Sequence, residues 1–388
     1  MTDVKVILFA NTDWYLYNFR RSLALALQAA GYEVLLLSPP GDYSARLLAL
    51  GLRWQPLQMD RRSVNPLREM VLLLRLVRLF RRERPALVHN FTVKCAVYGS
   101  IAARLARISA RINAVDGLGY VFASEDRKAR WLRPLVRAML RVALGGRGAR
   151  LILQNPDDRT SFEKFGLATA DNVDLIPGAG VDCSRFCPNA RAAAIETPTV
   201  LLAARLLWEK GLAEYVEAAR ILRSQGRKVR FLLAGNPDPG NPAAVPEATI
   251  RDWVAQGIIE WLGHVDDMAK LYASVDIVVL PSFYREGLPT SLLEAAACGL
   301  PLITTDMPGC REVVQHEADG LLVPPRDSRA LAEAIARLLD STALRSRLGE
   351  AARTKVLAKF DERIVIQRTQ EVYRQLVPAD RVSARIGA

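Results

Sequence analysis

The feature that most constrains the fold is an alternation of short, wholly apolar runs with longer amphipathic stretches, which occurs twice along the chain. In the first series the apolar runs are VKVILFA, EVLLLSP, ALVHNF, ARINAV and RLILQN. In the second series they are TVLLAAR, KVRFLLAG, IIEWLGH, DIVVLPS and PLITT. Strands that are apolar throughout and alternate with helices predict parallel sheets covered on both faces.

The stretches between these runs carry apolar side chains at helical spacing. The predicted helices cover residues 18–30, 66–84, 93–108 and 128–144 in the first series and 211–226, 246–256, 266–273 and 290–299 in the second. Residues 361–376 predict one more amphipathic helix near the end of the chain.

A chain of 388 residues exceeds the size at which a single hydrophobic core keeps growing. A polar, alanine-rich stretch at 188–198 separates the two series. We therefore predict an α/β protein of two Rossmann-like, doubly wound parallel-sheet domains. The first spans 1–190 and is joined by the terminal helix at 361–376, the second spans 191–360, and the two face a central cleft.

The excess positive charge belongs to the first half. Residues 1–190 hold 28 Lys and Arg against 16 Asp and Glu, whereas residues 191–388 hold 25 of each. A basic half beside a neutral half indicates that one domain meets an anionic surface, either phospholipid headgroups or nucleic acid.

Two predicted helices of the first half combine this charge with apolar side chains. In WLRPLVRAMLRVAL, Arg133, Arg137 and Arg141 lie four residues apart beside apolar positions, and residues 66–84 are similarly basic and apolar. We predict that such helices rest in an anionic membrane interface. Ordinary Rossmann helices with snorkelling arginines are the alternative.

The chain shows no long membrane-spanning or secretory segment. No apolar run reaches the roughly 18 residues that span a bilayer, and the first residues lead straight into a strand. The five cysteines form no CxxC pair, which favours free thiols. We expect a cytoplasmic protein.

One second-domain segment, YREGLPTSLLEAAACGLP, combines a helix start with two glutamates. A strand ends at Ser282 and a helix begins near Pro289, so unpaired backbone N–H groups there suit a phosphate or diphosphate. Glu286 precedes the helix, and Glu294 lies inside it, where it could accept hydrogen bonds from ribose hydroxyls. A dipole-complementing Glu286 and a solvated Glu294 are the alternative interpretation.

Arg205 and Lys210 lie in the loop after the first strand of the second domain. Two cations at the carboxyl end of a strand could hold a diphosphate and stabilise its charge as it leaves. Alternatively, they are solvated or paired with a neighbour such as Glu209.

Together these motifs resemble the retaining glycosyltransferases of family 4. The resemblance rests on the Arg205–Lys210 pair, the E-x7-E arrangement of the two glutamates, the preceding LPS and the following CGLPLITTDMPG, and it is most specific over residues 200–325. In the first half, NTDWYLYNFR, VHNFTVKCAVYGSIAAR and INAVDGLGYVF look like the subgroup that adds N-acetylated or related sugars to lipid-linked glycans in bacterial polysaccharide assembly.

The resemblance implies a GT-B fold and a set of donor-binding residues in the second domain. Arg205 and Lys210 would bind the donor diphosphate, Glu294 the ribose, and Glu286 the transferred sugar. The backbone groups of Gly287, Leu288 and Thr290 would contact the phosphate and the sugar. Val265 would lie beside the base.

In the first domain the resemblance implies a loop that faces the diphosphate or the acceptor. Its residues are Asn11, Thr12 and Asp13, with His89, Asp116 and Gly117 as further candidates. The chain departs from the family here, because many members carry a glycine-rich turn after the first strand and a histidine where this chain has Asp116-Gly117. The residue that touches the far side of the sugar is left open, and a structural role is the favoured interpretation of His89.

The function implied is that of a retaining hexosyltransferase, which moves an N-acetylhexosamine from a UDP-sugar to an undecaprenyl-diphosphate-linked saccharide in cell-surface polysaccharide or glycan biosynthesis. No D-x-D motif occurs near a strand end, so we expect cationic side chains in place of a metal ion and no cofactor. The expected location is the cytoplasmic face of the inner membrane, against its anionic leaflet.

Four other classes of protein compete with this one. A nucleotide-sugar epimerase or a phosphorylase could use the same two-domain architecture. A basic nucleic-acid-binding protein would explain the charge, but the chain has no zinc-finger, RRM or KH signature, and no nucleic-acid partner is expected. A dehydrogenase is disfavoured because no GxGxxG follows the first strand of either domain.

Overall fold

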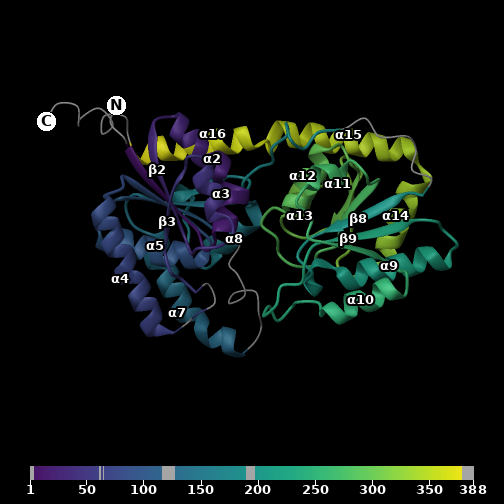
Figure 1. Cartoon of the computed structure of the whole chain (residues 1–388), viewed down its shortest axis with the longest axis horizontal. Coiled ribbons are helices and arrows are strands. Elements are labelled where there is room, and N and C mark those ends of the chain that lie inside the picture. The colour runs from purple at the N-terminus through teal and green to yellow at the C-terminus, as the bar shows by residue number, and fades with distance from the viewer. Residues whose placement is uncertain (1–3, 61–62, 64, 116–126, 189–196, 378–388) are drawn as a thin grey trace. The chain divides into compact units, whose positions relative to one another are not determined.

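The computed structural model describes residues 4–60, 63, 65–115, 127–188 and 197–377. The chain forms two compact units (Figure 1). The first unit runs to Ala179 and resumes at Val365, and the second runs from Gly180 to Ile364. The chain therefore leaves the first unit after Ala179, eleven residues before the boundary that the sequence predicts after residue 190.

The first unit is built on a parallel sheet that has seven strands in the described part of the chain, ordered β3-β2-β1-β4-β5-β6-β7. The strands are β1 Val4–Phe9, β2 Tyr32–Ser38, β3 Arg53–Pro56, β4 Leu87–Phe91, β5 Ala110–Ala114, β6 Ala149–Leu153 and β7 Val173–Leu175. The strand order reverses between β1 and β4, as in a doubly wound fold. The sequence does not predict the outermost strands β3 and β7, because both are short and only partly buried.

Helices cover both faces of this sheet, because successive strand residues point to opposite sides. Leu8 and its alternate neighbours pack toward α2 (Arg21–Ala29), α3 (Ser44–Ala49) and α16 (Glu362–Leu376). The other face carries α4 (Pro66–Glu83), α5 (Val93–Leu105), α7 (Arg127–Leu144) and α8 (Pro156–Lys164). Figure 1 shows α4, α5 and α7 on the same side of the sheet. The remaining short elements are α1 Asp13–Tyr15, a π-helical turn Leu16–Arg20 and a 3-10 turn Ala170–Asn172.

The second unit repeats the plan with six parallel strands among the residues described, ordered β10-β9-β8-β11-β12-β13. They are β8 Thr199–Ala203, β9 Arg230–Ala234, β10 Glu260–Gly263, β11 Ile277–Leu280, β12 Leu302–Thr305 and β13 Leu321–Val323. The order reverses between β8 and β11. The sequence predicts all of these strands except β13, whose apolar run is too short to stand out.

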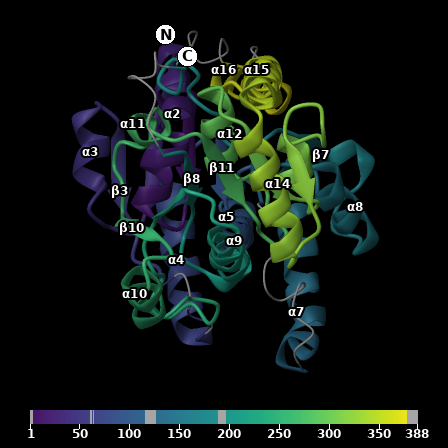
Figure 2. The same cartoon turned by 90° about the vertical axis from the view of Figure 1, so that its right-hand side faces the viewer.

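One face of the second sheet is covered by α9 (Leu212–Ser224), α10 (Glu247–Ala255) and α14 (Ser328–Asp340). Figure 2 shows α9 and α14 side by side. The other face is covered by α11 (Met268–Tyr272), α12 (Thr290–Ala297), α13 (Cys310–Val313) and α15 (Thr342–Lys359), and a 3-10 turn spans Trp208–Lys210. Two parallel-sheet α/β units of this kind confirm the predicted fold class.

All five cysteines are free thiols. Within the described segments, no helix combines the length and hydropathy that crossing a bilayer requires.

Candidate active site

The candidate site lies where the strand order of the second sheet reverses. The neighbouring strands β8 and β11 both end at this edge, and in doubly wound sheets ligands bind beyond the carboxyl ends of such strands. After β8 the chain forms the 3-10 turn that ends at Lys210, and after β11 it passes Ser282 and Glu286 before α12 begins. The two loops therefore bring their side chains to one place.

Lys210 and Glu286 form an ion pair across these loops. The Lys210 ammonium donates a hydrogen bond to Glu286 Oε1, and each side chain is only 12% exposed. Ser282 Oγ lies 2.8 Å from the same carboxylate oxygen and 3.1 Å from the carbonyl of Glu209, so its single proton serves one acceptor at a time. The pairing of Lys210 with Glu209 that the sequence leaves open is not the one observed.

Two glycines hold the loops in place. A Cβ on Gly211 would lie 2.1 Å from the carbonyl oxygen of Pro281, and a Cβ on Gly309 would lie 2.1 Å from that of Gly287. Both glycines adopt positive φ, at +78° and +81°. Any side chain at either position would push apart the segments that carry Lys210 and Glu286.

Arg205 takes a different partner from Lys210. Its guanidinium donates a hydrogen bond of 3.1 Å to Asp238, which follows β9, and the Arg205 side chain is 63% exposed. An exposed pair of this kind contributes little stability, about 0–1 kcal/mol. Arg205 can therefore exchange Asp238 for an incoming phosphate at small cost.

Glu294 lies on α12, one turn into the helix, and is held by Tyr272 from α11. The Tyr272 hydroxyl lies 3.1 Å from Glu294 Oε2 and 3.2 Å from the backbone carbonyl of Ser291. Burial raises the pKa of Glu294 to about 7, whereas the bond from Tyr272 acts in the opposite direction. A solvated Glu294, the alternative from the sequence, does not fit this environment.

The start of α12 offers backbone donors beside these side chains. The helix begins at Thr290, where the sequence predicts it, with Pro289 in the N-cap position, and no described side chain caps it. Gly287 and Leu288 are partly buried in the approach to the helix. Leu288 and Val265 both pack against the core beneath α11 and α12.

In the first unit, the loop after β1 uses most of its polar groups internally. Asp13 is buried, and its carboxylate accepts hydrogen bonds of 2.8 Å and 2.9 Å from the backbone N–H groups of Trp14 and Tyr43. Thr12 Oγ1 accepts a bond of 3.1 Å from the N–H of Tyr15 and caps α1. Asn11 remains partly exposed at the carboxyl end of β1.

His89 lies inside β4, where it is buried. Its Nδ1 is 2.7 Å from the hydroxyl of Tyr373 on α16, and its ring lies 4.1 Å from that of Phe91. Burial, and secondarily the charge of Arg20, lowers the pKa of His89 well below its usual value, which keeps the ring neutral. Asp116 and Gly117 lie outside the described residues.

Sequence patterns did not reveal Ser282, Tyr272 or Asp238, because each acts through a tertiary partner. They also missed Thr92, at the carboxyl end of β4 where the first sheet reverses its strand order. Thr92 adopts φ 73° and ψ 157°, a conformation that a β-branched residue rarely takes, and such strain is concentrated at functional sites.

The fold and the site define a class. Two doubly wound units, one of which carries a cation–carboxylate pair before an uncapped helix start, are the arrangement of a GT-B glycosyltransferase. Residues 5–154 match the family model described as "Glycosyl transferase 4-like", and residues 197–341 match "Glycosyl transferases group 1". The chain belongs to this glycosyltransferase family and is a hexosyltransferase.

Curated relatives share most of its length. The chain is 28% identical, over 93% of its length and 96% of the relative's, to N,N'-diacetylbacillosaminyl-diphospho-undecaprenol alpha-1,3-N-acetylgalactosaminyltransferase of Campylobacter jejuni. It is 25% identical, over 81% of its length and 82% of the relative's, to UDP-Gal:alpha-D-GlcNAc-diphosphoundecaprenol alpha-1,3-galactosyltransferase of Escherichia coli. The epimerase, phosphorylase and nucleic-acid-binding alternatives find no support in these relatives.

Solved structures show the same fold. Sucrose-phosphate synthase from Thermosynechococcus elongatus superposes with a TM-score of 0.78 at 23% identity, covering 97% of this chain and 100% of that one. Anabaena HepE in complex with UDP gives a TM-score of 0.76 at 20% identity, covering 96% and 100%. At these identities the likeness concerns the fold alone.

Proposed function

We propose that the protein transfers an N-acetylhexosamine from a UDP-sugar to an undecaprenyl-diphosphate-linked saccharide, with retention of configuration and without a metal ion. The observation that carries the proposal is the Lys210–Glu286 pair beside the uncapped start of α12. The two curated relatives, whose names describe transfer to diphospho-undecaprenol-linked sugars, support the acceptor class.

The donor diphosphate would bind between Lys210 and the start of α12. The ammonium group, the free N–H groups around Thr290 and an Arg205 released from Asp238 all present positive charge to one place. As the glycosidic bond to the diphosphate breaks, negative charge grows on the leaving group, and preorganised donors stabilise it. These groups supply the charge that a divalent ion supplies in other transferases.

Binding of the donor would divide the Lys210–Glu286 pair between two parts of the substrate. The phosphate attracts Lys210, and the freed Glu286 carboxylate accepts hydrogen bonds from sugar hydroxyls. Ser282, which contacts Glu286, keeps the carboxylate in place during this exchange. For retention we propose front-face attack within an ion pair, and no side chain is assigned as a covalent nucleophile.

The nucleoside would lie along α12 toward β10. Glu294, one turn into the helix, is placed to accept hydrogen bonds from ribose hydroxyls, and Val265 offers an apolar surface for the base. In the first unit, Asn11 and strained Thr92 follow adjacent strands and are the residues we propose to meet the acceptor. Asp13 and His89 would act indirectly, by shaping the loop and the sheet.

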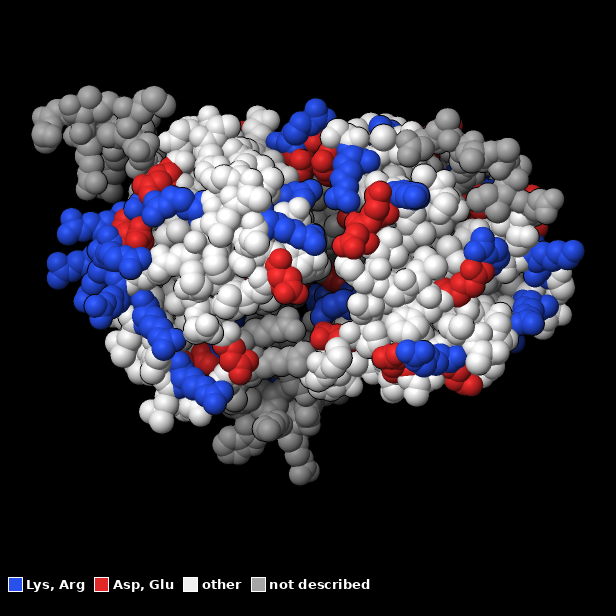
Figure 3. Space-filling model, viewed as in Figure 1, with Lys and Arg blue, Asp and Glu red and all other residues white. Residues whose placement is uncertain are grey.

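We propose that α4 places the enzyme on the cytoplasmic face of the inner membrane. Its solvent side exposes Leu67 at 79%, Met70 at 54% and Leu74 at 61%, followed toward the end of the helix by exposed arginines such as Arg78. Figure 3 shows Lys and Arg side chains gathered over the end of the first unit where α4 lies. An apolar stripe with adjacent cations suits an anionic bilayer interface.

In the second basic helix, α7, two of the arginines bind carbonyl groups of the protein instead of facing a membrane. Arg137 donates a hydrogen bond of 2.7 Å to the carbonyl of Phe165, and Arg141 donates one of 3.1 Å to that of Gly166, just beyond the end of α8. Cations at a helix C-terminus satisfy its unpaired carbonyls. The membrane contact is therefore assigned to α4.

The test is a panel of UDP- and GDP-sugars offered with and without an undecaprenyl-diphosphate-linked sugar, followed by product mass and the anomeric configuration of the new linkage. We expect a product that gains one N-acetylhexosamine from the UDP donor with an unchanged anomeric configuration. An inverted linkage would overturn retention, and conversion of the donor in the absence of acceptor would overturn the transferase assignment.

A further inference from the structure

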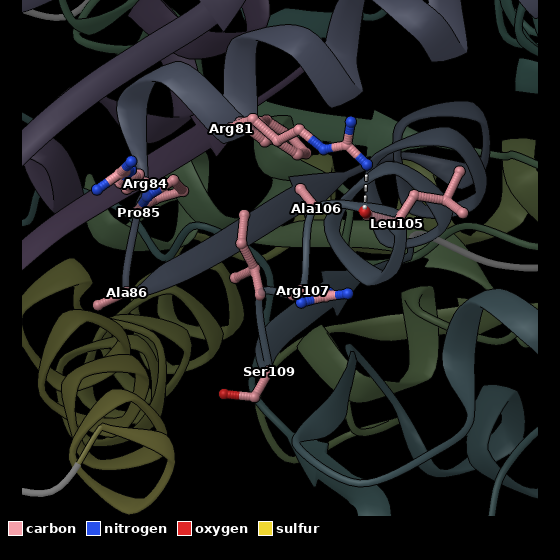
Figure 4. A pocket seen from close by; sticks show the side chains of 10 residues that line it. Arg81, Arg84, Pro85, Ala86, Leu105, Ala106, Arg107 and Ser109 are labelled. Carbon is pink, nitrogen blue, oxygen red and sulfur yellow. Dashed lines mark hydrogen bonds between the residues drawn. The ribbon is translucent and has the colours of Figure 1, made fainter.

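The first unit contains a hollow at the edge of its sheet opposite the carboxyl ends of the strands. It lies between the C-terminal ends of α4 and α5 and the starts of β4 and β5, with a volume of about 630 Å³. Three arginines line it, namely Arg81, Arg84 and Arg107 (Figure 4). The hollow is separate from every residue assigned above to the transfer reaction.

The hollow carries positive charge without a carboxylate to balance it. Its lining contains no Asp or Glu, and none of the three arginines forms an ion pair with any residue in the described part of the chain. The acidic residue next in sequence, Glu83, is already bonded to Lys5 at 3.0 Å and to Arg82 at 2.9 Å. The positive charge of the lining is therefore available to an anion from solution.

A fourth arginine adds positive charge next to the lining of the hollow. Arg111 is buried at the start of β5 and donates hydrogen bonds of 3.2 Å to the carbonyls of Ile108 and Ser109, two residues of the lining. Burial, together with the charge of nearby Arg104, lowers the pKa of Arg111. Its hydrogen-bond partners are carbonyls, which bear only partial charge and therefore do not neutralise the Arg111 guanidinium.

The backbone at two of the arginines is strained. Arg84 at the end of α4 has φ 47°, and Arg107 just past the end of α5 has φ 63°. The residue that adopts this left-handed conformation after a helix is usually glycine, because a Cβ is disfavoured there. Arginine at both positions places two long cations beside one hollow at a conformational cost.

Helix dipoles explain only part of this arrangement. Cations near a helix C-terminus are favourable, and Arg81 fits that account because its Nη2 donates a hydrogen bond of 3.2 Å to the carbonyl of Leu105. In Figure 4 that bond is drawn, and Arg107 extends to the same side of the view as Arg81, whereas Arg84 lies at the other end of the hollow. Arg84 and Arg107 are both exposed residues.

We propose that this hollow is a binding site for a phosphate-bearing anion, with Arg81 and Arg107 at one end of the site and Arg84 at the other. Guanidinium groups match phosphate oxygens in bidentate pairs, and the Ser109 hydroxyl adds a further donor. A phospholipid headgroup and a soluble phosphate compound share this chemistry. The site stands independently of the proposed transfer reaction.

The first test maps arginine reactivity toward phenylglyoxal by mass spectrometry, with the full chain in pyrophosphate, with phospholipid vesicles, or in chloride of equal ionic strength. We expect saturable protection of Arg84 and Arg107 by pyrophosphate, with Arg75, exposed on α4 outside the hollow, left reactive. Equal protection of Arg75 by pyrophosphate, or no protection of Arg84 and Arg107 by either pyrophosphate or vesicles, would overturn the proposal.

The vesicle arm of the same mapping separates the two sources of phosphate. Protection of Arg84 and Arg107 by phosphatidylglycerol vesicles but not by phosphatidylcholine vesicles, and to a greater extent than that of Arg75, identifies a headgroup as the ligand. Protection by pyrophosphate without any effect of vesicles on Arg84 and Arg107 identifies a soluble ligand. Both results support the site.

A second test uses calorimetry with pyrophosphate in a Lys210→Ala, Arg205→Ala background, so that the donor site does not contribute. We expect Arg84→Ala with Arg107→Ala to weaken binding at least about tenfold, as for loss of charged hydrogen bonds. The control pair Arg75→Ala with Arg78→Ala removes the same charge and should leave binding nearly unchanged. Equal weakening by both pairs would show diffuse attraction and contradict a built site.

Discussion

Lys210 and Glu286 neutralise each other in the free enzyme, and this determines what substitution of either should do. Removal of one partner leaves the other charge largely buried without compensation, which destabilises a protein more than the loss of the pair as a whole. The same two groups are proposed to divide between phosphate and sugar. Stability and activity should therefore respond differently to single and double substitutions.

We predict that Lys210→Met and Glu286→Gln each lower kcat/KM by about 10²–10³. In thermal unfolding, the double variant should be more stable than the sum of the two single effects implies, because it leaves no orphaned charge, yet it should remain inactive. Additive destabilisation in this double-mutant cycle would contradict an energetically coupled pair.

Glu294 should destabilise the free protein as pH rises. Its folded pKa of about 7 lies above its ordinary value of 4.5, so the unfolded chain ionises first, and stability present below pH 4.5 is lost between pH 4.5 and pH 7. The free energy of unfolding of Glu294→Gln should therefore exceed that of wild type at pH 8 by on the order of 2 kcal/mol, with little difference near pH 4.5, and thermal unfolding at the two pH values measures this. A difference that does not change with pH would contradict this assignment.

Tyr272 is predicted to position Glu294. Tyr272→Phe removes the hydrogen bond to the carboxylate, and we expect UDP to bind about 5–10-fold more weakly with kcat nearly unchanged. Because that bond lowers the pKa of Glu294, the pH dependence of UDP affinity should also move to higher pH. Calorimetric titration with UDP between pH 6 and pH 8.5 measures both effects, and loss of kcat without a change in affinity would exclude this role.

At the scale of elements, the loops after β8, β11 and β12 form the site only because glycines let their backbones meet. The sequence predicts the strands that carry these loops, since their apolar runs are long enough to recognise. It also places Lys210 and Glu286 in loops at strand ends. It cannot predict that Lys210 pairs with Glu286 whereas Arg205 pairs with Asp238, because those partners lie 76 and 33 residues away in the chain.

Gly309→Ala tests this dependence. Its Cβ would meet the carbonyls of Gly287 and Glu286, so we expect the activity to fall at least about tenfold as the loop shifts. Gly226 is a matched control, because it has a similar φ of +74° but a Cβ added there would meet nothing within 4 Å. Gly226→Ala should lose about 1 kcal/mol of stability and keep its activity in the same assay. Equal activity of the two variants would contradict the role of Gly309.

At the scale of the whole molecule, the structure shows where the excess positive charge of the first half lies. The basic half folds into a unit whose α4 exposes apolar side chains and arginines on one side, whereas α7 commits Arg137 and Arg141 to the end of α8. The sequence treats both helices alike, because snorkelling and interfacial arginines follow the same periodicity. Only the packing distinguishes them.

The membrane role of α4 predicts that Leu67→Ser with Leu74→Ser lowers cosedimentation with phosphatidylglycerol vesicles several-fold, since each removes exposed apolar area from the interface. Val254→Ser with Leu357→Ser, at positions 40% exposed in the second unit, is the control and should bind vesicles like wild type. If the α4 variant binds vesicles with unchanged affinity, the membrane contact lies elsewhere on the protein.

The most direct test of the central claim is the initial rate of UDP release from a UDP-N-acetylhexosamine in EDTA, with and without an undecaprenyl-diphosphate-linked saccharide, for wild type and Lys210→Ala. We expect release that depends on the acceptor, persists in EDTA and falls by about 10²–10³ in the variant. Release that EDTA abolishes, or that Lys210→Ala leaves unchanged, would contradict catalysis by the cationic site at the ends of β8 and β11.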